Sequence, residues 1–296
     1  MAALKSSILG FPRIGADREL KRVIERHWAG HADEAEVIEV AQTLRARHWL
    51  AMREAGIDEV PSGDFSLYDH VLDTALLVGA VPERYRALPS RMSRTFAMAR
   101  GLQRDGFDLR ALEMTKWFDT NYHSLVPELE ARQVFALDAS ELLADFHEAR
   151  KLGLVTRPVV LGPVSFLKVA KRVDGGSTLE LLTPLLEVYA QLLAQLGAAG
   201  VPAVQLDEPT LVLDTDEGTR AAFEQAFARL ARVPKRPAVT LTTYFGALGE
   251  NVGLVTRSGF EALHLDLVRG EGQLAQVLAS LPETMALSLG LVDGRN

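Results

Sequence analysis

The sequence predicts an α/β fold built on a parallel sheet, of the (β/α)8 or TIM-barrel class. From residue 157 onward, short apolar runs alternate with helical stretches, a pattern typical of parallel sheets. Several of these runs end in Asp, Glu, Thr or Tyr, and barrels carry their polar sites at the carboxyl ends of strands. The chain has 296 residues, and one barrel commonly fills about 250.

Eight segments are strand candidates, because each is short, apolar and bounded by turn residues. They are 6–12, 60–66, 115–123, 157–167, 202–209, 237–246, 260–268 and 283–294. Helical patterns separate the last of them, at 182–200, 216–233 and 271–282. Thr183 with Pro184 has the form of a helix N-cap followed by proline. The final strand candidate has no helix after it, so the predicted barrel lacks its final elements within this chain.

The first half of the chain reads as helices between short strands. A helix from Asp17, as N-cap, to Gly30 places Leu20, Val23 and Ile24 on one face. Further helices are predicted over 33–55, 68–81 and 138–153, and a helix that continues into a loop over 88–108. Asp138 or Ser140 is the expected cap of the helix over 138–153. No linker divides the chain, so residues 1–296 are predicted to form a single domain.

Composition excludes several classes of function. A formal net charge of -7 and a pI near 5.6 argue against general binding of nucleic acid or of a membrane surface. The chain has no cysteine, which excludes disulfides, thiolate zinc ligands and a cysteine nucleophile within it. The N-terminus has no apolar segment of signal-peptide length and no run approaches 18 apolar residues. We therefore expect a soluble, cytoplasmic protein.

Polar residues at the ends of the strand candidates are the candidate site residues: Arg13, Asp64, Lys116, Asn121, His123, Asp207, Glu208, Tyr244, His264, Asp266 and Asp293. Asp207 and Glu208 form the most enzyme-like pair, since paired carboxylates perform acid–base chemistry. Adjacent strand residues, however, point to opposite faces. The other interpretation is structural: a carboxylate that caps the next turn or pairs with an arginine inside the barrel.

Metal and nucleotide sites have little support in the sequence. His27 and His31 are four residues apart, but Gly30 is expected to end the helix between them. His264 and Asp266 share a face without a third ligand. The chain has no phosphate-binding loop, no dinucleotide-binding glycine motif and no serine-hydrolase elbow.

The stretch Ala16–Arg22 places positive charge at the wrong end of a helix. Arg18 and Lys21 lie in the first turn, where the helix dipole disfavours cations by about 0.3–1 kcal/mol each. One interpretation is a local anion site at the helix start, and the other is a solvated charged face shared with Arg22 and Arg26. Lys116 beside Trp117 is open in the same way: simple packing, or a platform for a flat ligand.

Several segments in order along the chain resemble the family of cobalamin-independent methionine synthases, in its N-terminal half. They are LGFPRIGADRELKRVIERHWAG, ARHWLAMREAGID, GDFSLYDHVLD, EMTKWFDTNYHSLVPE, VVLGPVSFL, QLDEPTLVLD, LTTYFG, HLDLVRG and the terminal GLVDGRN. The resemblance runs from Ile8 to Asn296. It departs from the family pattern at Ser124, where the family commonly has tyrosine.

The resemblance implies two barrels derived by duplication. The C-terminal barrel, absent from this chain, would hold the zinc, with histidine, cysteine and glutamate ligands, and would bind homocysteine. The N-terminal barrel would bind the glutamate tail of the folate substrate, 5-methyltetrahydropteroyltriglutamate. Carried over by residue, the tail contacts are Arg18, Glu19, Leu20, Lys21 and Lys116; no catalytic residue and no metal ligand is expected in this chain, and Asp207-Glu208 becomes a remnant of a duplicated motif.

The implied activity of the whole enzyme is transfer of the N5-methyl group of the folate to homocysteine, giving methionine. This half alone would be inactive and would act with a catalytic barrel on the same or a separate chain. Two alternatives stay open. One is a stand-alone or split binding module that pairs with a separate catalytic barrel, and the other is an unrelated barrel hydrolase that uses Asp207 or Glu208.

Overall fold

A six-stranded parallel sheet forms the centre of the computed structural model, which describes residues 4–104 and 106–294. Neighbouring strands follow one another in the chain: β1 (Pro61–Ser62), β7 (Arg157–Leu161), β9 (Ala203–Asp207), β10 (Ala238–Thr242), β11 (Ala262–Asp266) and β12 (Ala286–Gly290). Each new strand is added at the same edge, which is the order of barrels, whereas doubly wound sheets reverse direction. The predicted α/β class with a parallel sheet is confirmed.

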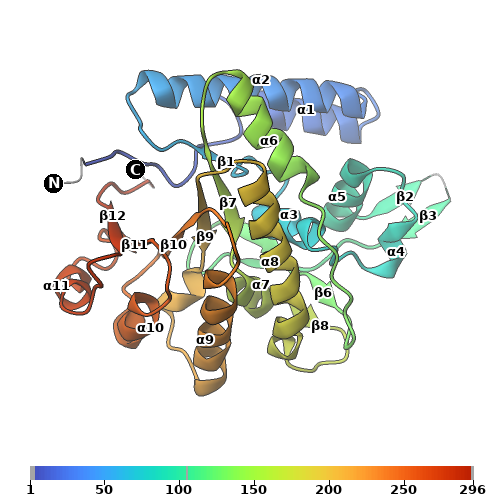
Figure 1. Ribbon diagram of the computed structural model, residues 1–296. Coiled ribbons are helices and arrows are strands. Elements are labelled where there is room, and N and C mark those ends of the chain that lie inside the picture. Colours follow the sequence, from blue (N-terminus) through green and yellow to red (C-terminus); the bar gives the residue numbers. More distant parts are fainter. Residues whose placement is uncertain (1–3, 105, 295–296) are drawn as a thin grey trace.

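Helices connect the consecutive strands and cover one face of this sheet (Figure 1). They are α6 (Ser140–Lys151), α7 (Pro163–Val169), α8 (Leu182–Ala198), α9 (Glu217–Ala231), α10 (Val252–Thr256) and α11 (Gln273–Leu278). Alternation along β9 divides its side chains between two faces. Val204 and Leu206 belong to the large apolar core that the sheet shares with the helices, so Gln205 and Asp207 lie on the opposite, inner face.

The N-terminal third adds a layer of helices at one end of the sheet. α1 (Glu19–Trp28) and α2 (Glu34–Glu54) lie side by side across the top of Figure 1. Leu20 and Ile24 of α1 share a buried cluster with Val37 and Leu44 of α2. The group of α3 (His70–Leu77), α4 (Glu83–Arg86) and α5 (Arg91–Arg100) follows. Asp33 caps α2 by accepting a hydrogen bond from the Glu36 amide, and Asp69 caps α3.

Six of the eight strand candidates contain a strand of the sheet, and the other two differ. Segment 6–12 contributes a single bridge, Ser7 to Glu59 beside β1. Segment 115–123 is wrong as a strand: it is an antiparallel hairpin of β4 (Met114–Lys116) and β5 (His123–Leu125). Trp117 donates its amide to the Tyr122 carbonyl and Phe118 has a φ of 52°, so the chain turns where the apolar pattern suggested continuation.

Other boundaries differ for local reasons. Residues 163–167, expected in a strand, begin α7 because Pro163 occupies its first turn. The loop expected after α5 is a second hairpin, β2 (Leu102–Arg104) with β3 (Phe107–Leu109). Thr183 is not a cap, since a 3₁₀ turn over Thr178–Leu181 leads directly into α8. α6 begins after Ala139, with Asp138 accepting a hydrogen bond from the Ser140 amide. One further short pair, β6 (Glu128–Leu129) with β8 (Lys171–Arg172), is parallel.

One helical segment has the length and apolarity of a membrane span. It covers Thr178–Ala198, with a mean hydropathy of 1.2, and 56% of its apolar window is buried inside the fold. Leu185, Leu192 and Leu196 of this segment are almost fully buried in the large core. A core helix explains its composition.

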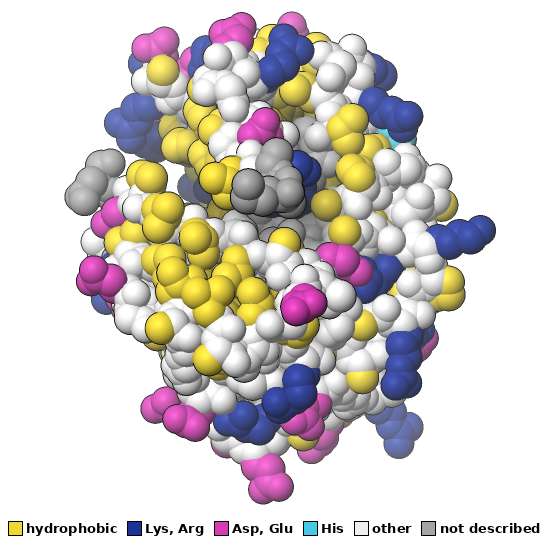
Figure 2. Space-filling model, turned by 60° about the vertical axis from the view of Figure 1, so that its left-hand side comes forward, with side chains coloured by type: hydrophobic (Ala, Val, Ile, Leu, Met, Phe, Trp, Pro, Cys, Tyr) yellow, Lys and Arg dark blue, Asp and Glu magenta, His cyan; other side chains and the backbone are white. Residues whose placement is uncertain are grey.

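The edge of the sheet at β12 is apolar and exposed. Leu289 is 41% exposed, and Leu291 and Val292, which follow the strand, are 69% and 87% exposed. Hydrophobic side chains gather on the face that Figure 2 shows, where the β12 side of the molecule comes forward. An open strand edge with apolar side chains favours pairing with a further strand.

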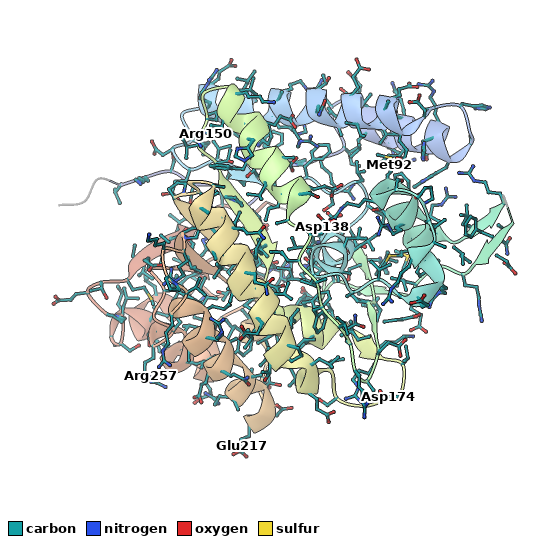
Figure 3. The ribbon with its side chains drawn as sticks, turned by 45° about the vertical axis from the view of Figure 1, so that its right-hand side comes forward. Met92, Asp138, Arg150, Asp174, Glu217 and Arg257 are labelled. Atoms are coloured by element: carbon teal, nitrogen blue, oxygen red, sulfur yellow. The ribbon has the colours of Figure 1, made fainter. Side chains whose placement is uncertain are left out.

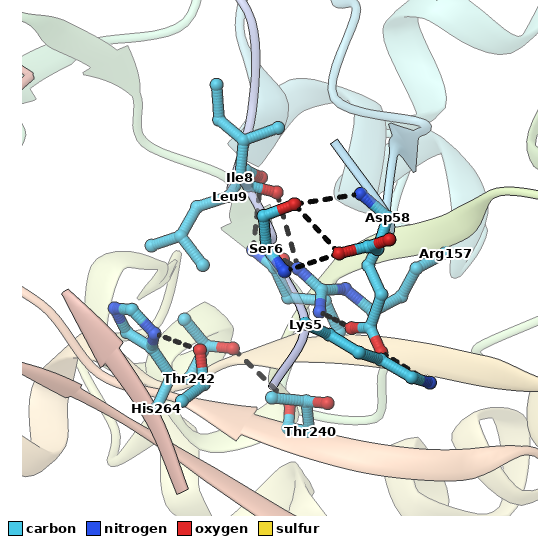
Figure 4. A network of polar contacts seen from close by, with 12 residues as sticks. Lys5, Ser6, Ile8, Leu9, Asp58, Arg157, Thr240, Thr242 and His264 are labelled. Atoms are coloured by element: carbon cyan, nitrogen blue, oxygen red, sulfur yellow. Dashed lines mark hydrogen bonds and ion pairs between the residues drawn. The ribbon is translucent and has the colours of Figure 1, made fainter. Parts of the chain in front are cut away.

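A buried arginine ties the N-terminal segment to the sheet (Figure 4). The guanidinium of Arg157, whose side chain is 4% exposed, donates to Glu59 Oε2 at 2.8 Å, to Gln205 Oε1 at 3.0 Å and to the carbonyl of Ile8 at 3.3 Å. A few residues away, Ser6 donates its amide and its hydroxyl to Asp58. These contacts fix residues 6–9 beside β1 without a continuous strand ladder.

Replacement of Arg157 should therefore destabilise the fold strongly. Arg157→Ala leaves the fully buried Gln205 amide oxygen without its donor and leaves the Glu59 carboxylate with only the exposed Lys5. We expect a loss of about 2–4 kcal/mol in the free energy of unfolding. Urea unfolding followed by circular dichroism measures it. The matched control is Arg229→Ala, which removes an exposed pair with Glu187 and should cost less than about 1 kcal/mol. Equal losses for both variants would contradict the assignment.

Candidate functional site

The start of α1 is held in an unusual backbone conformation. Arg18, rather than Asp17, is the N-cap residue, and its φ of 60° lies in the left-handed region. Gly15 precedes it with a φ of 85°, and a Cβ there would come within 2.1 Å of a Glu19 carboxylate oxygen. The amides of Arg18 and Leu20 donate to the carbonyls of Gly15 and Ile14. This tight turn places the Arg18 side chain in solvent at a defined point.

Glu19, Leu20 and Lys21 have three different surroundings. The Glu19 carboxylate accepts a hydrogen bond from Arg47 Nη2 at 2.7 Å. Its own backbone N–H, and next the Arg47 guanidinium, hold the pKa of Glu19 below its usual value. Leu20 is fully buried and anchors the helix. Lys21 Nζ lies 3.0 Å from Glu25 one turn later, with both side chains about half exposed.

Lys116 lies apart from α1 in the sequence, at the end of β4, and is exposed. Trp117 beside it is buried and packs edge-on against His70, with ring centroids 4.4 Å apart. The tryptophan is therefore a packing residue rather than an open platform. Ser124, the position at which the sequence departs from the resemblance, is fully buried in β5, and its hydroxyl has no partner among the described residues.

A cavity of about 400 Å³ lies on the inner side of the sheet. Strand-end residues Arg13, Asp64, Asp207 and Tyr244 line it, as the barrel prediction implies, whereas Lys116, His123, Glu208, His264 and Asp266 do not. Further lining residues come from the helices and from the turn before α6: His70, Asp73, Arg91, Asp138, Glu141 and Asp145. Asp138 lies just before α6, beside α3, where its amide donates to the Leu77 carbonyl (Figure 3).

Asp207 and Glu208 point to opposite faces of the sheet. Asp207 faces the cavity, where it accepts hydrogen bonds from Gln205 Nε2 at 2.9 Å and from the Tyr244 hydroxyl at 3.3 Å. Glu208 is fully buried on the other side and accepts from the amides of Val164 and Ser165 at 3.1 and 2.8 Å. It therefore caps α7, which is the structural interpretation of the pair, and a hydrolase with both carboxylates in one cleft loses its basis.

Three carboxyl groups of the cavity have pKa values far above the usual range. Burial raises the pKa of Asp73, Asp145 and Asp207 to about 7 in each case. Asp73 and Asp145 are not among the site residues predicted from the sequence, because they lie inside helices rather than at strand ends. The signal that could have found them is an aspartate within the apolar stretches HVLDTALL and ELLADF.

Metal ligands are a separate question. Within residues 4–104 and 106–294, no group of three His, Asp or Glu side chains is close enough to hold a metal ion, and the sequence has no cysteine. The residues of this chain do not fit a zinc site of the implied type, and no chemical step is assigned to a metal on them.

The pKa of Asp207 makes a prediction about stability. Its folded value of about 7 exceeds the unfolded value of about 3.9, so its contribution is fully present below about pH 4 and is lost as the pH rises to 7. Burial lowers the pKa of His70 and His264 to about 4, and these groups act in the opposite direction. Both histidines are present in the unaltered chain and in an Asp207 variant, so their effect cancels in the difference between the two free energies of unfolding.

We therefore expect Asp207→Asn to gain stability relative to the unaltered chain between pH 4 and 7.5. The gain is roughly 2–4 kcal/mol, since one pKa unit corresponds to about 1.4 kcal/mol. Urea midpoints at a series of pH values measure it, with exposed Asp214→Asn as the control. A difference that does not change with pH for Asp207→Asn would show that this carboxyl titrates normally.

Comparison with known proteins extends these observations. The family model described as "Cobalamin-independent synthase, N-terminal domain" matches residues 5–296. The chain is 58% identical to a 5-methyltetrahydropteroyltriglutamate–homocysteine methyltransferase of Xylella fastidiosa over 97% of its length, and 48% identical to one of Chelativorans over 100%. It spans 38% and 40% of the lengths of these relatives.

Solved structures agree on the fold. A B12-independent methionine synthase described as putative, from Listeria monocytogenes, matches with a TM-score of 0.69 at 11% identity, over 99% of this chain and 83% of that one. A B12-independent methionine synthase from Shewanella matches with a TM-score of 0.64 at 14% identity, over 88% and 72%. The family match, the close relatives and the shared fold together show that this chain belongs to the N-terminal domain family of the cobalamin-independent synthases.

Proposed function

We propose that this chain is the folate-binding N-terminal half of a methyltransferase that transfers the N5-methyl group of 5-methyltetrahydropteroyltriglutamate to homocysteine. Residues 1–296 act as one domain, in the cytoplasm, together with a C-terminal catalytic barrel on the same or a separate chain. The names of the relatives supply the reaction. The observation in this chain that carries the proposal is the fixed, solvent-exposed cationic turn at the start of α1.

The geometry of this turn suits a flexible polyanion. The Arg18 guanidinium has no ion-pair partner in the part of the chain that the structure describes, and it is exposed. The amides of Arg18 and Leu20 already bond to carbonyls, so these two N–H groups are not available to an anion, and the proposal assigns the anion to the side chains. Guanidinium and ammonium groups bind carboxylates through charge-assisted hydrogen bonds.

The neighbours of Arg18 have supporting roles in the proposal. Arg47 pairs with the Glu19 carboxylate and so neutralises an acid next to Arg18 that would repel the glutamate tail. Lys21 can exchange its exposed partner Glu25 for a ligand carboxylate, because such surface pairs contribute less than about 1 kcal/mol. Leu20 positions both cations by its burial. Lys116, exposed on β4, is the proposed further contact to the folate.

This half contributes binding and orientation rather than bond making. In the whole enzyme, zinc held by the catalytic barrel would activate the homocysteine thiol; none of that chemistry is assigned to residues of this chain. Holding the folate by its tail reduces the freedom that the reacting methyl group must lose, and this is how a remote contact contributes to catalysis.

Binding of folate to the chain tests the proposal. By isothermal titration calorimetry, the triglutamate form should bind more tightly than the monoglutamate form, and the affinity should fall as salt rises. Arg18→Ala and Lys21→Ala should each weaken triglutamate binding about three- to tenfold while leaving monoglutamate binding unchanged.

The matched control is Arg257→Ala, which removes an exposed arginine directly after α10, far from α1 (Figure 3). This variant should bind both forms like the unaltered chain. Equal affinity for the mono- and triglutamate forms, or an equal loss in all three variants, would overturn the assignment of the tail site.

A further inference from the structure

The cavity on the inner side of the sheet holds carboxylates without counter-ions. Two arginines line it: Arg91 is paired with Asp138 and Glu141, at 2.9 and 2.7 Å, and Arg13 donates a hydrogen bond to the carbonyl of Tyr68. Asp145 is paired with Arg45 at 3.2 Å. Three other lining carboxylates, those of Asp64, Asp73 and Asp207, have no ion-pair partner within the described ranges.

Each of these three carboxylates has only neutral partners. Asp64 accepts a hydrogen bond from the amide of Phe11 at 2.8 Å. The Ser66 hydroxyl donates to Asp73. The Gln205 side-chain amide and the Tyr244 hydroxyl donate to Asp207. A buried carboxylate without a counter-ion is costly, and here the cost is visible in the raised pKa values of all three. A bound cation would remove it.

A second, independent feature of the wall also points to a hydrogen-bond donor. His70 lines the cavity, and its Nε2 is buried with no hydrogen-bond partner among the described residues. Burial, with a smaller effect of Arg13, lowers the pKa of His70 to about 4, so the ring is neutral near pH 7. A neutral imidazole has one nitrogen that accepts a hydrogen bond, and Nε2 of His70 is left without a hydrogen bond among the described residues.

The shape and lining of the cavity select the kind of cation. The described part of the chain has no group of three ligating side chains close enough for a metal ion, so the acids are spread around the cavity rather than gathered at a point. Apolar side chains separate them: Leu9, Phe11, Phe65, Leu77, Leu142, Val159 and Leu161. A volume of about 400 Å³ is in the range of small-molecule sites.

We propose that this cavity is a binding site for a small aliphatic ammonium ion, whose charged group is held by Asp207 and Asp64 and whose stem lies on the apolar wall. His70 and Asp73, neighbours on α3, offer a second polar position for a longer ligand. The site is built from the inner face of the sheet and from α3, and no residue of the α1 tail site lines it.

Titration of the chain with n-butylammonium chloride at pH 7.5 tests the proposal. We expect saturable binding by calorimetry, and no binding of 1-butanol, which has a similar stem without the charge. Asp207→Asn and Asp64→Asn should each weaken butylammonium binding at least tenfold. Asp214→Asn, an exposed acid outside the cavity, is the matched control and should bind like the unaltered chain.

The outcomes separate this site from the tail site and from a folding defect. Circular dichroism and a urea midpoint establish that each variant is folded, and Asn at 207 removes a buried charge rather than a packing group. Arg18→Ala should retain butylammonium binding whether or not the folate tail binds at α1. Equal binding of butanol and butylammonium, or an unchanged affinity in both cavity variants, would overturn the proposal.

Discussion

A polar inner face is the constraint on which the rest of the structure depends. The strand registers align Val159 with Gln205 and Thr240, and Leu161 with Asp207, Thr242 and His264. Most of these groups need hydrogen-bond partners away from water. Arg157 supplies one layer of partners by joining Glu59, Gln205 and the Ile8 carbonyl, and His264 with Ser288 supplies part of another, at 2.8 Å. The N-terminal segment lies where it does because it brings a carbonyl to this network.

The two candidate sites use this framework in different ways. The α1 turn lies outside the polar network of the inner face, on a helix whose apolar face is buried against α2. Its cations are therefore exposed without any contact to the sheet. The cavity is part of this network: Asp207 shares Gln205 with the Arg157 network. A change at Arg157 therefore affects Asp207 in the cavity, through the shared Gln205 side chain and through the loss of a nearby positive charge.

The sequence carried the fold class and most elements, and its failures have physical causes. Periodicity identifies a buried strand such as β9 because both of its faces are constrained. It fails at 115–123, where the apolar residues Trp117 and Phe118 serve a hairpin and pack on His70 and Phe245. Alternation of side chains along a strand separated Asp207 from Glu208 correctly. No local rule could bring Asp73 of α3 to the wall that holds Asp207, since that contact is made by the tertiary fold.

The cap that Glu208 provides has a consequence for variation at a distance. A Cβ on Gly162 would lie 2.2 Å from the Glu208 carboxyl carbon, so the glycine and the long acidic side chain occupy one shared space, 46 positions apart in the numbering. A side chain fits at position 162 only if the side chain at position 208 is shorter than glutamate. A shorter acid at 208 would leave the first amides of α7 without their acceptor. The two positions should therefore covary in an alignment of relatives, as a linked pair whose origin is steric and electrostatic and owes nothing to catalysis.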